Sequence, residues 1–147
     1  AEPMAAADAV RAVVLDTNVA LDLLVFDDPS VQALRAALAG GHLRWLVLPG
    51  MRDELARVLT YPRVAAQLTA RGKPAHEVLA AFDASSHCSA PVPAAPVRCT
   101  DQDDQPFLDL ALAHGALLLS KDQAVLATHR RMAALGVELA QRFVTNA

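Results

Sequence analysis

The 147-residue sequence has few aromatic residues, few cysteines and no long hydrophobic run, and each shortage excludes a class of protein. Aromatic residues make up 4% of the chain, too few for a broad platform on which nucleic-acid bases stack. Its 2 cysteines are fewer than a secreted disulfide scaffold carries. No apolar stretch approaches the roughly 20 residues of a membrane helix, and the first residues lack the basic segment followed by an apolar one that is typical of a signal peptide. We therefore expect a cytoplasmic protein without membrane contact.

Excess charge of one sign is also lacking. The net charge is -3, which excludes a protein that holds nucleic acid by a broad basic surface. A bound metal ion would still supply positive charge at one place. Reduced thiols are expected at Cys88 and Cys99, although one bridge between them stays open. A zinc site that adds His87 also stays open, but its adjacent His-Cys pair lacks the loop spacing of structural zinc sites.

Hydrophobic residues are abundant at 54%, so the chain can fill the interior of one domain. The alanine-rich residues 1–10 are expected to be a ragged or disordered N-terminus. Residues 11–147 are expected to form a single domain.

Short apolar runs alternate with helical patterns along the whole chain. Ala12–Leu15 and Ala116–Leu119 are short, apolar and bounded by polar residues, which is typical of strands buried on both faces of a parallel sheet. Further strands are predicted at 43–48 and 137–140, with an edge strand or extended connection at 88–98. The predicted helices cover 19–25, 30–39 with Ser30 as N-cap, 51–59, 63–71, 75–85, 106–114 and a last segment ending near 135. This order predicts an α/β fold in which helices cover both faces of a mainly parallel sheet.

Four acidic residues stand where this fold would aim them at one place. Asp16 and Asp122 follow the two buried strands, and ligand sites of parallel sheets lie at the carboxyl ends of strands. Asp104 comes just before the helix that contains Pro106, where the helix dipole favours a carboxylate. Glu54 has Val58 four residues later, so it lies at the border of the core face of its helix.

Converging carboxylates repel one another, and their pKa values rise until some take up protons. Mg²⁺ or Mn²⁺ relieves this repulsion, because these hard cations prefer oxygen ligands and keep several waters. Such a cation lowers the pKa of water, orients a phosphodiester and offsets charge on the departing oxygen. The sequence thus predicts a metal-dependent nuclease in which all four acids are catalytic metal ligands.

Each of these residues also has an ordinary structural explanation. Strand-end aspartates often form turns, Asp104 can cap its helix, and a helical glutamate such as Glu54 is usually solvated. Thr17, Asn18 and Ser120 are either caps or supporting groups for a carboxylate or a substrate phosphate. Lys121 is the best-placed phosphate contact by position. The other basic candidates are Arg44, Arg52, Arg63, Arg98, Arg130 and Arg131.

Four blocks of the sequence resemble, in order, the successive acidic motifs of the PIN-domain ribonucleases. They are Val-Val-Leu-Asp-Thr-Asn at 13–18, Arg-Asp-Glu-Leu-Ala-Arg-Val-Leu at 52–59, Asp-Gln-Asp-Asp-Gln-Pro-Phe-Leu at 101–108 and Leu-Leu-Ser-Lys-Asp at 118–122. The similarity spans Arg11 to Phe143 and is greatest to bacterial toxins of toxin-antitoxin pairs. The order of the four blocks is more specific than any single block.

The resemblance implies a flavodoxin-like, three-layer α/β/α PIN-like fold. It also implies an endoribonuclease that uses Mg²⁺ or Mn²⁺, leaves 5'-phosphate and 3'-hydroxyl ends on RNA, and is frequently a homodimer neutralised by an antitoxin protein. The acids of the family fall on Asp16, Glu54, Asp104 and Asp122, and its small polar residues fall on Thr17, Asn18 and Ser120.

Two features depart from the pattern of the family. Ala124 stands where many members have a further acid, which argues against tight binding of a second metal ion. The third block contains three aspartates, and we choose Asp104 because its distance to Gly115 suits the helix of the family. Asp101 and Asp103 are then supporting or solvated acids.

Two other functions stay open. A catalytically weak PIN-like scaffold would act by binding RNA or an antitoxin, and Ala124 favours it. A haloacid-dehalogenase-like phosphatase would use Asp16 as nucleophile, but Asn18 stands where that class needs a second aspartate.

Overall fold

Five parallel strands form a sheet at the centre of residues 10–144, the part of the chain that the computed structural model describes. Their spatial order is β3-β2-β1-β4-β5. The strands are β1 (Arg11–Leu15), β2 (Leu43–Val47), β3 (Ser86–Cys88), β4 (Leu117–Leu119) and β5 (Leu139–Ala140). All four pairings are parallel, so the carboxyl ends of the strands meet at one edge of the sheet. The predicted parallel α/β fold is confirmed.

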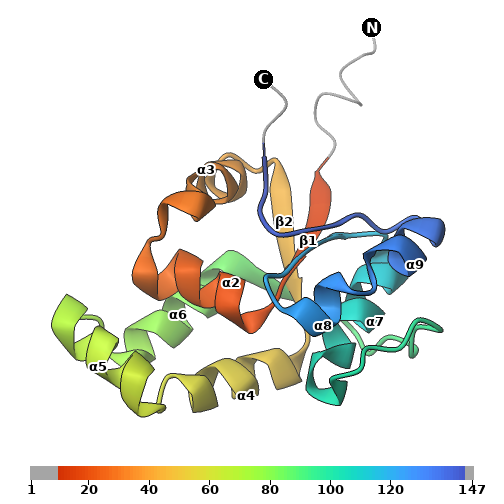
Figure 1. Cartoon of the computed structure of the whole chain (residues 1–147). Helices are drawn as coiled ribbons and strands as arrows, with labels where there is room; N and C mark the ends of the chain where they lie inside the picture. Colours follow the sequence, from red (N-terminus) through yellow and green to blue (C-terminus); the bar gives the residue numbers. More distant parts are fainter. Residues whose placement is uncertain (1–9, 145–147) are drawn as a thin grey trace, which may run out of the picture.

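Helices cover both faces of this sheet (Figure 1). On one side lie α2 (Thr17–Leu21), α3 (Gln32–Ala39) and α6 (Ala75–Ser85), and on the other lie α7 (Gln105–His114), α8 (Gln123–Leu126) and α9 (His129–Ala134). Two further helices, α4 (Pro49–Val58) and α5 (Pro62–Arg71), lie below the carboxyl ends of the strands in this view. Short helical turns are η1 (Asp22–Phe26), η2 (Pro29–Val31) and η3 (Gln102–Asp104). The result is a three-layer α/β/α architecture.

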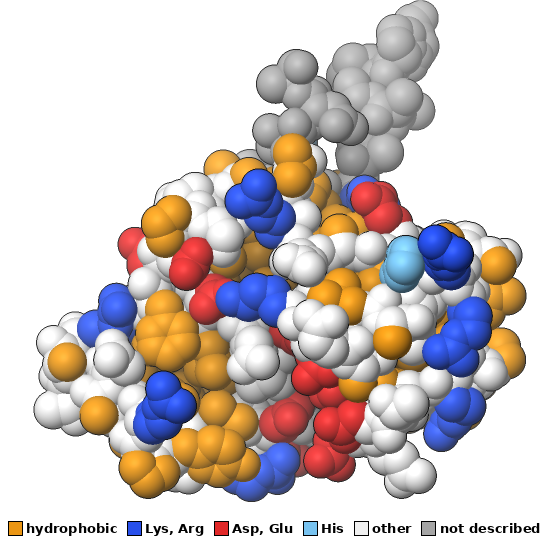
Figure 2. Space-filling view, viewed as in Figure 1, with side chains coloured by type: hydrophobic (Ala, Val, Ile, Leu, Met, Phe, Trp, Pro, Cys, Tyr) orange, Lys and Arg blue, Asp and Glu red, His pale blue; other side chains and the backbone are white. Residues whose placement is uncertain are grey.

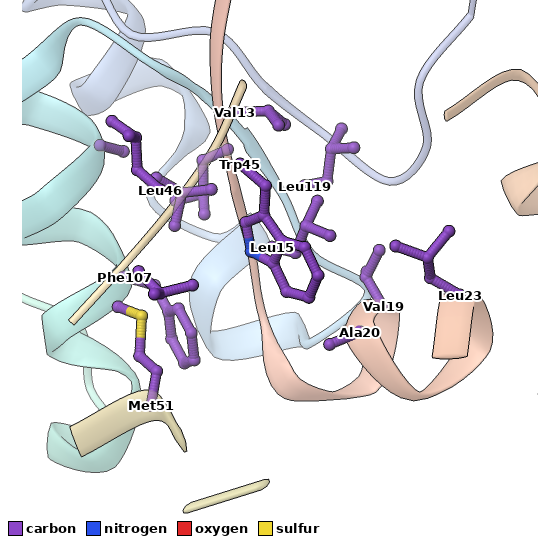
Figure 3. Close-up of a cluster of buried hydrophobic side chains, with 14 of the residues drawn as sticks. Val13, Leu15, Val19, Ala20, Leu23, Trp45, Leu46, Met51, Phe107 and Leu119 are labelled. Carbon is purple, nitrogen blue, oxygen red and sulfur yellow. The ribbon is translucent and has the colours of Figure 1, made fainter. Parts of the chain in front are cut away.

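The strands form where the sequence is apolar on both faces, because both faces are covered. Val13, Val14 and Leu118 are completely buried. Side chains from β1, β2, β4, α2 and α7 meet in one hydrophobic cluster (Figure 3). Trp45 packs edge-on against Phe82 of α6, with ring centroids 5.0 Å apart. This packing holds β1 and β4 rigidly side by side, and with them whatever follows the two strands.

The predicted helices around 19–39 need one correction. Ser30 is not the N-cap: the side chain of Asp28 accepts a hydrogen bond from the backbone N–H of Ser30 and caps the turn η2 instead. Aspartate two residues ahead of a free N–H forms such a turn readily, and it displaces the start of α3 to Gln32. The predicted break at 26–29 is present, since Asp27 adopts a left-handed conformation with φ of 49°.

Other boundaries move by a few residues. The predicted last helix is two short helices, α8 and α9, because the chain turns at Ala127–Thr128 between them. The edge strand β3 begins at Ser86, earlier than predicted, and only its last residue lies in the predicted segment. Helix α7 ends as predicted at Gly115, whose φ of 59° suits a residue without a side chain.

Some predictions concern parts of the chain that the structure does not describe. All of the expected ragged N-terminus except Val10 lies outside the described residues. A single domain over 11–147 stays a prediction. Within residues 10–144, no helix combines the length and the apolar character needed to span a membrane. Cys88 is exposed and Cys99 is buried, and both are free thiols.

Candidate active site

Asp16 lies at the carboxyl end of the central strand, and the fold buries it to 3% exposure. Its backbone N–H donates to the carbonyl of Leu119 at 3.0 Å, which places it beside the end of β4. One carboxylate oxygen accepts a hydrogen bond from the backbone N–H of Val19 at 2.9 Å and caps α2. Burial raises the pKa of Asp16, and hydrogen bonds from Ser120 and Val19 offset part of the rise. Burial thus makes the ionised form of Asp16 unfavourable, and the role of an N-cap does not by itself require an aspartate at a buried position.

Ser120 connects the two strand-end aspartates. Its hydroxyl donates to Oδ2 of Asp16 at 2.5 Å and accepts from the backbone N–H of Asp122 at 3.0 Å. The side chain of Asp122 in turn accepts from the backbone N–H of Ala124 at 2.8 Å, at the start of α8. The charge of Asp122 raises the pKa of Asp16. The two acids are thus held close together by a buried hydroxyl that is completely inaccessible to solvent.

Glu54 of α4 contacts the residue that follows Asp16 in the chain. Oγ1 of Thr17 donates to Oε1 of Glu54 at 2.8 Å. This bond joins the first residue of α2 to the middle of α4, and both side chains are only partly exposed. Asp53, the neighbour of Glu54, is exposed. The helical spacing that predicted an inward Glu54 agrees with this placement.

Asp104 lies where η3 leads into α7, in a loop that is anchored from beneath. The buried Gln105 accepts from the backbone N–H of Cys99 at 2.6 Å and donates to the carbonyl of Val97 at 3.1 Å. It also donates to Asp109, which itself holds the backbone N–H of Ala95. These contacts fasten the irregular segment before Asp104 to α7. These hydrogen bonds stabilise the conformation of the loop that carries Asp104.

The carboxylate of Asp104 has the least satisfied environment in the group. Its Oδ2 atom is buried and has no hydrogen-bond partner among the described residues. Burial and the nearby charges of Asp122, Asp101, Asp16 and Glu54 raise its pKa to about 7. The coupling shows that all four predicted acids lie within electrostatic reach of one another. Within residues 10–144, none of the four acids forms an ion pair with a lysine or arginine.

The neighbouring aspartates of the third block differ from Asp104. Asp101 is exposed, and its side chain accepts from the backbone N–H of Asp103 at 3.0 Å, so it caps η3. Asp103 is also exposed. The carbonyl of Asp101 accepts a hydrogen bond from the backbone N–H of Asp104 at 3.1 Å, and the charge of its carboxylate raises the pKa of Asp104. The choice of Asp104 among the three as the acid of the family stays a prediction.

The four acids Asp16, Glu54, Asp104 and Asp122 have the ligand chemistry of a divalent-cation site, although their side chains do not form a complete coordination shell. Within residues 10–144, no three His, Cys, Asp or Glu side chains are positioned to hold an ion as they stand, and this includes His87, Cys88 and Cys99. A bound cation would give the unpaired Oδ2 of Asp104 a partner, and it would lower the raised pKa values of Asp16 and Asp104. Carboxylate oxygens are the ligands that Mg²⁺ and Mn²⁺ prefer. The oxygens of Asp16 keep lone pairs beyond the bonds that they accept.

Two supporting candidates lie in other surroundings. The ammonium group of Lys121 forms an ion pair with Asp22 of η1, whose side chain is only 11% exposed. Asn18 is exposed and lines a groove beside α5. Nothing in the sequence pattern marks Asp22, because its partner is far along the chain. Arg52, another basic candidate, pairs with Asp83.

The comparisons with known proteins agree with this architecture. The family described as the PIN domain matches residues 12–124, a range that contains all four acids. No match was found among curated proteins. Proteins with a PIN domain are generally nucleases, and they typically use divalent metals. Since the match covers well over half of the chain, this protein belongs to the PIN-domain family.

Proposed function

We propose that this chain is a metal-dependent endoribonuclease that hydrolyses phosphodiester bonds in RNA. The observation that carries the proposal is the buried, unpaired carboxylate oxygen of Asp104, surrounded by the charges of three other acids. A structural cluster would pair these charges with a lysine or arginine. The nearest such candidate along the chain, Lys121, is paired with Asp22 instead.

Asp16, Glu54, Asp104 and Asp122 would hold the cation, Mg²⁺ or Mn²⁺. When bound, the cation would polarise the phosphodiester and lower the pKa of water beside it. Ser120 keeps the carboxylate of Asp16 oriented through the bond to Oδ2, and Thr17 does the same for Glu54. Burial and the neighbouring acids raise the pKa of Asp104, and a bound cation would offset this by stabilising the ionised carboxylate.

The biological role that we propose is that of a toxin in a toxin-antitoxin pair. Its support is the similarity of the four acidic blocks to such toxins. An antitoxin protein would then be a partner, and the active form would be a homodimer. A short reading frame for a DNA-binding type of protein next to this gene would support that role.

The test of the enzyme is cleavage of a labelled RNA by purified protein with added Mn²⁺, with and without EDTA. We expect cleavage that EDTA stops, with 5'-phosphate ends on the products. Asp16→Asn keeps the capping bond from Val19, because an amide oxygen can accept it, but it removes the charge. We expect this variant to lose roughly 100-fold or more of the activity, as for other losses at metal sites.

Asp53→Asn is the matched control, since it removes the same charge from an exposed position next to Glu54. It should cleave as the wild type does. Calorimetric titration with Mn²⁺ adds a readout that does not depend on turnover. Cleavage that persists in Asp16→Asn, or Mn²⁺ binding that is unchanged in it, would refute the proposal. RNA binding without cleavage by the wild type would favour a binding scaffold.

A further inference from the structure

An open groove of about 890 Å³ lies beside the acidic site, between α5 and the end of η1. Leu21, Phe26 and Tyr61 supply its apolar wall, and Arg63 and Arg71 stand along it. Figure 2 shows this region at the lower left, where hydrophobic side chains over α5 are interleaved with basic ones. The red acidic side chains gather next to it at the bottom centre. The nuclease proposal assigns no role to this groove.

Tyr61 is the feature of the groove that most needs an explanation. It lies in the turn between α4 and α5, just before Pro62, and it is 47% exposed. Only a few aromatic residues are present in the chain, so an exposed one is notable. A single exposed ring is enough to stack one base, even where a broad platform is lacking.

The groove has two basic residues, and one of them, Arg71, is held by contacts within the protein. The guanidinium of Arg71 lies over the ring of Phe26, 5.6 Å from its centroid. Arg71 also donates to the carbonyl of Phe26 at 3.2 Å. Arg63 is exposed and forms no ion pair among residues 10–144. Against these two cations stands one carboxylate, Asp28, so the groove is net positive in a chain whose net charge is -3.

The groove and the acidic site are connected through adjacent residues at the start of α2. Asn18 lines the groove, and the preceding residue, Thr17, is hydrogen-bonded to Glu54. Tyr61 lies in the turn between α4, which carries Glu54, and α5. A chain of nucleotides that has one phosphate at the acids therefore has the groove beside it for its neighbouring nucleotides.

We infer that Tyr61, Arg63 and Arg71 make this groove a binding site for the unpaired nucleotides next to the cleaved bond. One base stacks on Tyr61, the phosphates lie against Arg63 and Arg71, and Asn18 faces the nucleotide between the groove and the acids. The inference rests on the proposed nuclease function for the identity of the ligand. A protein helix would also fit an apolar wall, but it gives no reason for a positive charge in an otherwise acidic molecule.

The test is fluorescence anisotropy with a labelled RNA of about ten nucleotides, within the site sizes of single-strand-binding folds. Binding is measured in EDTA and again with Ca²⁺, a hard cation that uses the same oxygen ligands. Tyr61→Ala should weaken the binding of single-stranded RNA roughly five- to hundred-fold, the range for loss of one base-aromatic stack. Tyr61→Phe should bind as the wild type does. Binding of a duplex with the same sequence should be equal in the wild type and in Tyr61→Ala.

Arg63→Gln should reduce the slope of log affinity against log salt concentration by about 0.7, the contribution of one phosphate on a single strand. Leu135→Ala and Arg11→Gln are controls, because they alter an exposed apolar side chain at the end of α9 and a basic side chain at the amino end of β1, away from the groove. Both should bind RNA normally. Wild-type affinity in Tyr61→Ala and Arg63→Gln, or equal losses for single strand and duplex, would overturn the inference.

These measurements test the groove inference and the nuclease proposal separately. If the wild type cuts RNA and Tyr61→Ala binds and cuts equally well, the groove inference fails and the nuclease stands. If the wild type does not cut RNA but binds single strands through Tyr61, the nuclease fails and the groove inference stands. If the wild type binds no RNA under either condition, the groove inference is overturned.

Discussion

Replacing Asp104 by asparagine should make the metal-free protein more stable, although it removes a proposed metal ligand. Burial and neighbouring negative charges raise the pKa of Asp104 from its ordinary 3.8 to about 7. A difference of this size corresponds to about 4 kcal/mol of unfavourable free energy for the ionised form. Asp104 is only partly buried, so water screens much of it, and we expect about 1–2 kcal/mol to remain.

A smaller effect opposes this gain. Asp104 occupies the N-cap position of α7 without a capping hydrogen bond from its side chain. Loss of its charge removes a favourable interaction with the helix dipole, which contributes about 0.5 kcal/mol. Asparagine is otherwise as good an N-cap residue as aspartate. The net stabilisation should therefore be about 1 kcal/mol when the carboxylate is ionised.

The sign of the pH dependence follows from linkage. Because the folded pKa lies above the unfolded one, the folded state holds more protons between about pH 4 and about pH 7. The contribution of Asp104 thus lowers the stability of the wild type as the pH rises through this window. Asp104→Asn lacks this loss, so its advantage should be present at about pH 8 and nearly absent at about pH 4.

The assay is urea unfolding in EDTA at several pH values. The single tryptophan, Trp45, is buried against Phe82 and reports unfolding by its fluorescence. Asp103→Asn is the control, because this neighbour is exposed, and its stability should be close to that of the wild type at every pH. An Asp104→Asn variant that is less stable than the wild type at about pH 8, or equally altered at all pH values, would show that the reasoning is wrong.

Two more substitutions test the supports of the acidic site. Ser120→Ala leaves Oδ2 of Asp16 without its buried donor, so the free energy of unfolding should fall by about 1–3 kcal/mol in urea melts. No loss of stability would contradict the assigned hydrogen bond. Lys121→Met leaves the carboxylate of Asp22 without its partner and should cost about 1–2 kcal/mol in the same assay. Adding Asp22→Asn should recover part of that loss, and purely additive effects would argue against the pair.

Much of the fold follows directly from local patterns in the sequence. Completely apolar short runs such as 116–119 are typical of strands buried on both faces, and strands of this kind alternate with helical patterns throughout. Pro106 and Gly115 mark the first turn and the end of α7, where the structure has them. Such signals depend on neighbours a few residues away, so they can be read without coordinates. The pattern at residues 28–30 was ambiguous, because both Asp28 and Ser30 are good N-cap residues, and the structure has Asp28 as the cap.

The sequence also determined which acids to consider, because their order and their positions after strands or at helix starts are local properties. It did not determine how they meet. The bond from Thr17 to Glu54, the bond from Ser120 to Asp16 and the pairing of Lys121 with Asp22 join residues between 37 and 104 positions apart. These partners are chosen by packing of the sheet and helices, which brings distant side chains to within hydrogen-bond distance.

The same reason explains why only the tertiary structure revealed the state of Asp104 and the groove at Tyr61. A pKa near 7 is the sum of burial and of several charges from separate elements, and it has no local signature in the sequence. Tyr61 reads as an ordinary residue of a turn until the positions of Phe26, Arg63 and Arg71 are known. Interactions between residues close in sequence thus determined the helices, the strands and the candidate acids. Long-range packing decided which of the side chains lie together.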